Sequence, residues 1–166
     1  QLAQKVAVYV LDLPERRTVY MELNPKMPPH SIEAEQSALG AMILDKGAIT
    51  DVVEIVESGD FYKEAHSEIF SAILRLYGRN EPVDIVTLSD ELTRAGMLEA
   101  IGGIEYLSDL TSFGVLSTNA RHYASIIEEK SMLRTLIRTS SEVLERGYEN
   151  EGADTLLEFA GQNIFD

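Results

Sequence analysis

Few residues of this chain are of a type and spacing that could do chemistry. Its 166 residues include no cysteine, which excludes disulfides, thiolate zinc sites and cysteine nucleophiles. The three histidines, His30, His66 and His122, lie on separate segments. His66 belongs to an apolar helical pattern, where a histidine more often fills a hydrogen-bonded structural position than binds a metal or acts as a base. The carboxylates are too numerous for any two of them to be paired as acid and base.

The short motifs of nucleotide-binding and hydrolytic sites are also absent. A P-loop places two glycines around four residues and then a lysine, so that backbone amides and the lysine cradle phosphates, and none of the eleven glycines here is followed by lysine. No GxSxG, HExxH or GxGxxG occurs. We therefore expect no catalytic, metal or cofactor site in this chain.

The net charge of −14 at pH 7 opposes binding to nucleic acid unless basic residues gather on one face. Within residues 28–166 the one local enrichment is Lys130, Arg134 and Arg138, four residues apart on a predicted helix. The favoured interpretation is a solvated face in which Glu128 and Glu129 supply compensating charge. The alternatives are a docking strip for an acidic partner or a module that binds single-stranded DNA. No apolar run approaches the ~20 residues of a membrane span and no secretory signal is present, so we expect a cytoplasmic protein.

A long helix predicted over residues 119–146 and closed by Gly147 dominates the chain. Its apolar residues recur at helical spacing over about seven turns, which at ~1.5 Å per residue gives a length of about 40 Å. Such a helix exceeds what a small body can cover, so part of it should project. The apolar stripe also rotates, because Ser131, Arg134 and Arg138 occupy positions where the first stripe would continue. The first half should therefore pack on the body of the chain, whether the helix is continuous or kinked near Glu128.

The second half is predicted to pair with a final helix over residues 153–165, after a short polar linker at 148–152. The two helices would form an antiparallel hairpin with a narrow apolar seam. Two helices leave much apolar surface open, so a second copy of the chain is the expected cover. The residues predicted to form the seam and the self-association surface are Leu133, Leu136, Ile137, Val143, Leu144, Leu156, Leu157 and Ile164.

Residues 28–118 predict a globular body of short helices. Ser31 is a good N-cap for the first helix, Gly78 a C′ residue for the third, and Thr87 with Asp90 an N-cap signature for a fourth that ends at Gly96. Residues 112–118 read as a loop before the long helix. The core of this body is predicted from Ile32, Leu39, Met42, Ile43, Ile49, Val52, Val53, Val56, His66, Ile69, Phe70, Ile73, Leu74, Tyr77, Ile104, Leu107 and Leu110.

Three parts follow from these patterns. Residues 1–27 are an extension that forms a short hairpin, stays disordered or is foreign to the native chain, and we assign it no function. Residues 28–118 form the body and residues 119–166 the hairpin. The predicted fold class is all-α, a globular helical bundle followed by a projecting antiparallel helical hairpin.

Seven fragments, in order, resemble the amino-terminal domain of bacterial replicative DNA helicases of the DnaB family. Each fragment is weak alone, but together they span about 139 residues in the right order. The fragments are PPHSIEAEQSALGAMILD at 28–45, DFY at 60–62 with His66 and IF at 69–70, PVD at 82–84 with VTL at 86–88, EL at 91–92, GGIEYL at 102–107, YASIIEEK at 123–130 and LRTLI at 133–137. One departure is that the family commonly carries a Thr-Pro pair before the long helix, and residues 113–119 have none.

The resemblance implies a domain whose hairpins pair between neighbouring subunits, so that six copies form a collar above a ring of RecA-like motors. The motor, with its Walker motifs, ATP, Mg²⁺ and 5′–3′ helicase activity, would lie beyond residue 166. This part would not be an enzyme. It would assemble as a dimer, trimer of dimers or hexamer, near the nucleoid, with little direct contact to nucleic acid.

The resemblance also implies two protein partners, primase and a helicase loader. Matching positions place Tyr106, Ile137 and Val143 in elements on which primase contact depends. Ile137 and Val143 belong to the predicted hairpin as well, so helix packing is an equally good interpretation of each.

Overall fold

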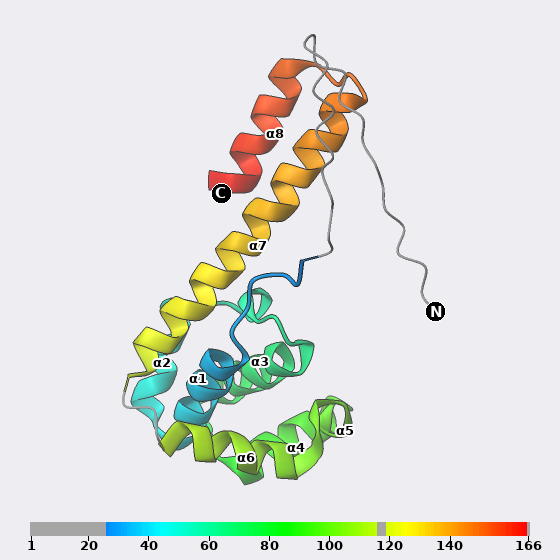
Figure 1. Ribbon diagram of the computed structural model, residues 1–166. Helices are drawn as coiled ribbons and strands as arrows, with labels where there is room; N and C mark the ends of the chain where they lie inside the picture. The colour runs from blue at the N-terminus through cyan, green and yellow to red at the C-terminus, as the bar shows by residue number, and fades with distance from the viewer. Residues whose placement is uncertain (1–25, 116–118, 166) are drawn as a thin grey trace.

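The structure is a computed structural model that describes residues 26–115 and 119–165 (Figure 1). Within these residues the regular elements are all helical and no strand occurs, which confirms the all-α prediction. The hairpin considered for residues 1–27 lies outside the described residues, apart from positions 26 and 27. The elements are α1 Ile32–Leu44, α2 Lys46–Val53, the 3-10 turn η1 Ser58–Asp60, α3 Glu64–Gly78, α4 Ile85–Arg94, α5 Leu98–Ile101, α6 Gly103–Val115, α7 Ala120–Tyr148 and α8 Ala153–Phe165.

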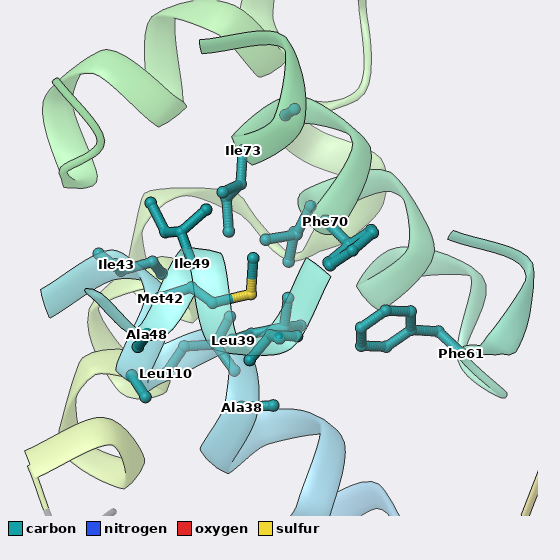
Figure 2. Packing of buried hydrophobic residues seen from close by; sticks show 14 of the residues in the cluster. Ala38, Leu39, Met42, Ile43, Ala48, Ile49, Phe61, Phe70, Ile73 and Leu110 are labelled. Carbon is teal, nitrogen blue, oxygen red and sulfur yellow. The ribbon is translucent and has the colours of Figure 1, made fainter. Parts of the chain in front are cut away.

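Helix α1 is the centre of the body, because it is apolar on nearly every side and contacts α2, α3, α6 and α7. Figure 2 shows Leu39 and Met42 of α1 among Ile49, Phe70 and Leu110, which come from α2, α3 and α6. All five side chains are fully buried. The body therefore has one contiguous core. No helix in the described residues is long and apolar enough to cross a membrane.

Two glycines set the close approach of α1 and α6. A Cβ atom at Gly40 would lie 2.0 Å from the carbonyl oxygen of Leu110, and one at Gly114 would lie 2.4 Å from the carbonyl oxygen of Gly40. Side chains are excluded at both positions, so the two backbones touch. The loop predicted over residues 112–118 is therefore partly wrong, since α6 continues to Val115 and makes this contact; residues 116–118 lie outside the described residues.

Several predicted helix ends are shifted. The N-cap of α4 is Asp84, not Thr87: the Asp84 carboxylate accepts the Thr87 amide N–H at 2.9 Å, and the Thr87 hydroxyl accepts the Asp84 amide N–H at 3.0 Å. Gly78 is the last residue of α3, and the left-handed residue after it is Asn80, with φ of 56°. Asparagine tolerates this conformation because its short polar side chain bonds locally.

The long helix is a single element. α7 runs without interruption from Ala120 to Tyr148, and Gly147 lies inside it rather than closing it. Ala120, Ala124 and Ile127 are buried against the body, as predicted for the first half. Beyond the body α7 projects, and α8 folds back along its far end to form the antiparallel hairpin of the predicted fold class (Figure 1).

Candidate interaction surface

The seam of the hairpin is made by one face of α7 and one face of α8. On α7 the buried or half-buried positions include Leu136, Thr139, Val143 and Arg146, at helical spacings of three and four residues. On α8 they include Leu156, Phe159 and Ala160. The Arg146 guanidinium lies 4.2 Å from the centre of the Phe159 ring and its Nε donates to Glu151 at 2.7 Å, which closes the seam at the turn.

Other apolar residues predicted for the seam point away from it. The exposed fractions of Ile137, Leu144 and Leu157 are 54%, 55% and 72%. Each follows directly a residue of the seam, in the pairs 136–137, 143–144 and 156–157. Neighbours on a helix lie about 100° apart, so both members of a pair cannot face the same partner helix. The seam predicted for these positions was therefore too wide.

The outward-pointing residues of the two helices share one broad face of the hairpin. In each pair the outward residue is the second one. On both helices the outward residues are therefore rotated by about 100° from the seam, in the same direction when each helix is viewed along its own chain. Because the helices are antiparallel, equal rotations bring the two rows to the same side. We call this set the outward face; it consists of Leu133, Ile137 and Leu144 of α7 with Leu157 and Ile164 of α8, which are 37–72% exposed.

Tyr106 lies on the body, where its hydroxyl belongs to a buried hydrogen-bond network. Nε2 of His66 lies 2.5 Å from the Tyr106 hydroxyl and Nδ1 lies 2.5 Å from Oε2 of Glu35. The other oxygen of Glu35 accepts the amide N–H of Tyr62 at 2.6 Å. Because the carboxylate is an acceptor, Nδ1 carries the proton that it receives, and Nε2 is left to pair with the Tyr106 hydroxyl. His66 is thus the hydrogen-bonded structural histidine that the sequence predicts.

Arg134 is not part of a basic strip. Its Nη1 donates to the carbonyl oxygen of Pro29 at 2.8 Å and its Nη2 to that of Asp60 at 2.5 Å. The guanidinium is therefore committed to the body, whereas Arg138 one turn later is exposed. Both the solvated face and the docking strip are wrong for Arg134, because the contact partners of a long charged side chain depend on tertiary structure that spacing does not reveal.

No arrangement for metal binding appears in the parts of the chain that the structure describes. Within those parts no three His, Asp or Glu side chains could together hold a metal ion. A hollow of about 370 Å³ lies between the start of α2 and the end of α3, with Leu44, Ile49, Tyr77 and Val83 in its lining. Its lining also includes Lys46, Asn80 and Glu81, so it mixes apolar and polar side chains. The outward face is consequently the strongest candidate for function.

Residues 27–129 match a protein family described as the DnaB-like helicase N terminal domain. Curated relatives include the replicative DNA helicases DnaB of Leifsonia xyli subsp. xyli (strain CTCB07), 47% identical over 127 residues, and of Geobacillus stearothermophilus, 46% identical over 142 residues. These matches cover 76% and 85% of this chain. They cover 28% and 31% of the relatives, so the chain spans about a third of their length or less.

Two solved structures share the fold. The N-terminal domain of DnaB helicase from Mycobacterium tuberculosis is 45% identical with a TM-score of 0.79, and the match covers 84% of this chain and all of that one. The N-terminal domain of DnaB helicase from Helicobacter pylori, described with its interactions with primase, is 20% identical with a TM-score of 0.59. That match covers 70% of this chain and 90% of the other, and it shows a likeness of fold.

Proposed function

The chain belongs to the family of DnaB-like helicase N-terminal domains, and we propose that its hairpin joins copies of the chain into the collar of a replicative helicase. It corresponds to the N-terminal domain of such helicases, which is not their catalytic motor. ATP-dependent unwinding would be the work of the whole protein, in the cytoplasm near the nucleoid. This domain would supply assembly and docking.

The outward face is the observation that carries this proposal. Five large apolar side chains, each 37–72% exposed, share one broad face of a projecting hairpin, and exposed apolar patches of this kind mark interaction sites. The positions between them along each helix are Ser140 on α7 and Gly161 on α8, which are small and uncharged. A partner helix could approach closely there.

A second copy of the chain is the occupant that fits best. Two copies of a chain with a net charge of −14 repel each other, and the outward face has no charged residue among its members. A two-fold pairing brings the same patch of each copy together, so an apolar face with small residues between its rows is complementary to itself. Further contacts would extend pairs to a trimer of dimers or a hexamer.

Docking of primase is the second part of the proposal. The relative from Helicobacter pylori is described with its interactions with primase, and family resemblance points to Tyr106, Ile137 and Val143. Ile137 belongs to the outward face and Val143 to the seam, so both would act on primase through the assembled hairpins. Tyr106 lies apart, on the body, and is held by His66. A helicase loader remains a further proposed partner.

A module for single-stranded DNA is the alternative, and the charges do not favour it. The net charge is −14, and Arg134, the centre of the basic group Lys130, Arg134 and Arg138, is bonded to backbone carbonyls. Binding through phosphate contacts would show a steep fall in affinity with salt. We expect no measurable affinity for an oligonucleotide even at low salt.

Light scattering after size exclusion tests the proposal directly. We expect the chain alone to have the mass of a dimer or larger, and to gain mass with the carboxy-terminal domain of the primase from its own organism. A chain that stays monomeric at high concentration would overturn the assembly role. An oligomer that gains no mass with primase would overturn docking by this domain and leave assembly standing.

A further inference from the structure

We infer that Arg134 is a positioning residue that fixes the angle between the hairpin and the body. Its guanidinium bridges two segments that are far apart in sequence, since one nitrogen donates to Pro29 before α1 and the other to Asp60 in η1. Three parts of the chain thus meet at one side chain of α7. That this angle matters for ring assembly rests on the proposed function. That Arg134 fixes the angle rests on the contacts of this chain alone.

Neighbouring side chains support the same junction. The hydroxyl of Ser131, one turn before Arg134, donates to Oδ1 of Asp60 at 2.7 Å. The Arg134 guanidinium also lies 5.7 Å from the centre of the Tyr62 ring, which stacks on the His30 ring at 4.2 Å. We call the following five residues the Arg134 latch: His30, Asp60, Tyr62, Ser131 and Arg134. Its members come from the arm before α1, from η1 and the residue that follows its C-cap, and from α7.

The latch lies where the helix leaves the body. Ile127 is the last fully buried apolar residue of the first half of α7, and Ser131 and Arg134 follow one and two turns later. These two are the last side chains of α7 in the described chain that bond to the body. At ~1.5 Å per residue, the free arm to Tyr148 is about 21 Å from Arg134 but about 32 Å from Ile127.

Without the latch, the last contact of α7 with the body is at Ile127 instead of Arg134. The unsupported part of the hairpin therefore becomes longer. A rotation of ~10° about Ile127 would displace the tip by roughly 5 Å, because the tip lies about 32 Å away. Hairpins that must meet others at a set angle to close a ring do not tolerate such freedom. The apolar core does not include the latch, so its loss should alter geometry more than folding.

An arginine is required because its planar fork can donate to two acceptors at once in fixed directions. A lysine at the same position keeps the charge and much of the stem but offers a single point donor. Arg134→Lys should therefore loosen the junction, and Arg134→Ala combined with Ser131→Ala should release it. Arg138→Ala removes an exposed arginine of the same helix and is the matched control.

Pulsed electron paramagnetic resonance distances test the inference. The chain has no cysteine, so spin labels go only to introduced ones, at Ser108 on the body and Glu145 near the tip, both exposed. Labelled chain is diluted with unlabelled chain so that only distances within one copy are recorded. Helicity is followed by circular dichroism and mass by light scattering.

We expect one narrow distance distribution for the parent and for Arg138→Ala. It should broaden or shift by several ångströms in Arg134→Lys, and further in the double variant, with helicity and self-association retained. An unchanged distribution in the double variant would show that helix stiffness alone sets the angle and would overturn the inference. Monomeric parent chain would overturn the proposed function instead, whatever the distances.

Discussion

Glu91 shows how one buried carboxylate joins two helices of the body. It accepts from Nε of Arg75 at 2.7 Å and from Nη2 of Arg79 at 2.6 Å, which ties α4 to α3. Hydrogen bonds from Arg79 and then Arg75 lower the pKa of Glu91 from its ordinary 4.5 to about 2. The charged carboxylate therefore stabilises the folded body, and this contribution should depend on pH.

We predict that Glu91→Gln lowers the free energy of unfolding at pH 7 by about 1–2 kcal/mol, since both arginines keep access to water. Because the folded pKa lies below the unfolded one, the contribution is full above pH 4.5 and is lost as the pH falls toward about 2. Urea unfolding at pH 7, 4 and 3 should show the gap between parent and variant closing. The exposed Glu99→Gln should show no such gap; a gap constant with pH would contradict the ion-pair account.

Tyr106 has a structural role and a proposed docking role. Removing only its hydroxyl tests the structural role. Tyr106→Phe keeps the ring but leaves Nε2 of the buried His66 without this partner. We predict a loss of about 1–2 kcal/mol in the free energy of unfolding, as for other unpaired buried groups. Thermal unfolding followed by circular dichroism measures it. Unchanged stability would mean that the hydroxyl bond to His66 contributes nothing.

For single residues, the sequence reveals which side chains are polar or charged but not which groups they form hydrogen bonds with. The apolar pattern around His66 predicts a structural histidine, whereas its partner Glu35, which lies 31 positions earlier, is not predicted. Glu35 is one of two glutamates in the first turn of α1, and nothing in the sequence separates it from the exposed Glu33. Arg134 is misread for the same reason, because both of its acceptors are backbone carbonyls and carry no mark in the sequence.

The contact between α1 and α6 depends on the absence of two side chains. We predict that Gly114→Ala lowers the free energy of unfolding by ~3 kcal/mol, because a Cβ there would meet backbone that cannot move aside as a side chain could. Gly78→Ala is the matched control, since its Cβ would meet nothing within 4 Å. Chemical unfolding curves of both variants compare the costs. Equal, small effects would show that the two helices can separate freely.

Adjacent leucines on α8 separate the seam from the outward face. We predict that Leu157→Asp weakens self-association but keeps the helicity of the chain, because Leu157 is 72% exposed within one copy. Leu156→Asp places a carboxylate in the seam and should reduce helicity and mass together. Circular dichroism and light scattering on the two variants give the comparison. The reverse pattern would place Leu157 in the seam.

The hairpin could be predicted from the helical periodicity of its apolar residues. Which of these residues face the seam could not. The change from an apolar stripe to Ser131 and Arg134 correctly indicated that the halves of α7 face different surroundings. These polar residues nevertheless continue to face the body, because what they meet there is polar backbone and a carboxylate. The adjacent apolar pairs were ambiguous, since composition alone does not say which member faces the second helix.

The whole molecule divides into a body with one core and a hairpin with an exposed apolar face. The body has a buried apolar core around α1, although Val86 and Val115 are exposed on its surface. The hairpin, over its described residues, has no such core and leaves Ile137, Leu144 and Leu157 more than half exposed. The all-α class and the family could be predicted from the sequence, because helical periodicity and the ordered motifs agree. The outward face required the structure, since it depends on two rows of different helices meeting on one side.

Disulfide trapping on this cysteine-free chain tests most directly whether the outward face binds a second copy. Single cysteines replace in turn Leu133, Ile137, Leu144, Leu157 and Ile164, with Arg138→Cys, Glu145→Cys and Glu158→Cys as controls on other faces. After mild oxidation of dilute protein, we predict covalent dimers from the outward positions nearest the two-fold axis and none from the controls. Dimers from the controls alone, or equally from every position, would contradict pairing through the outward face.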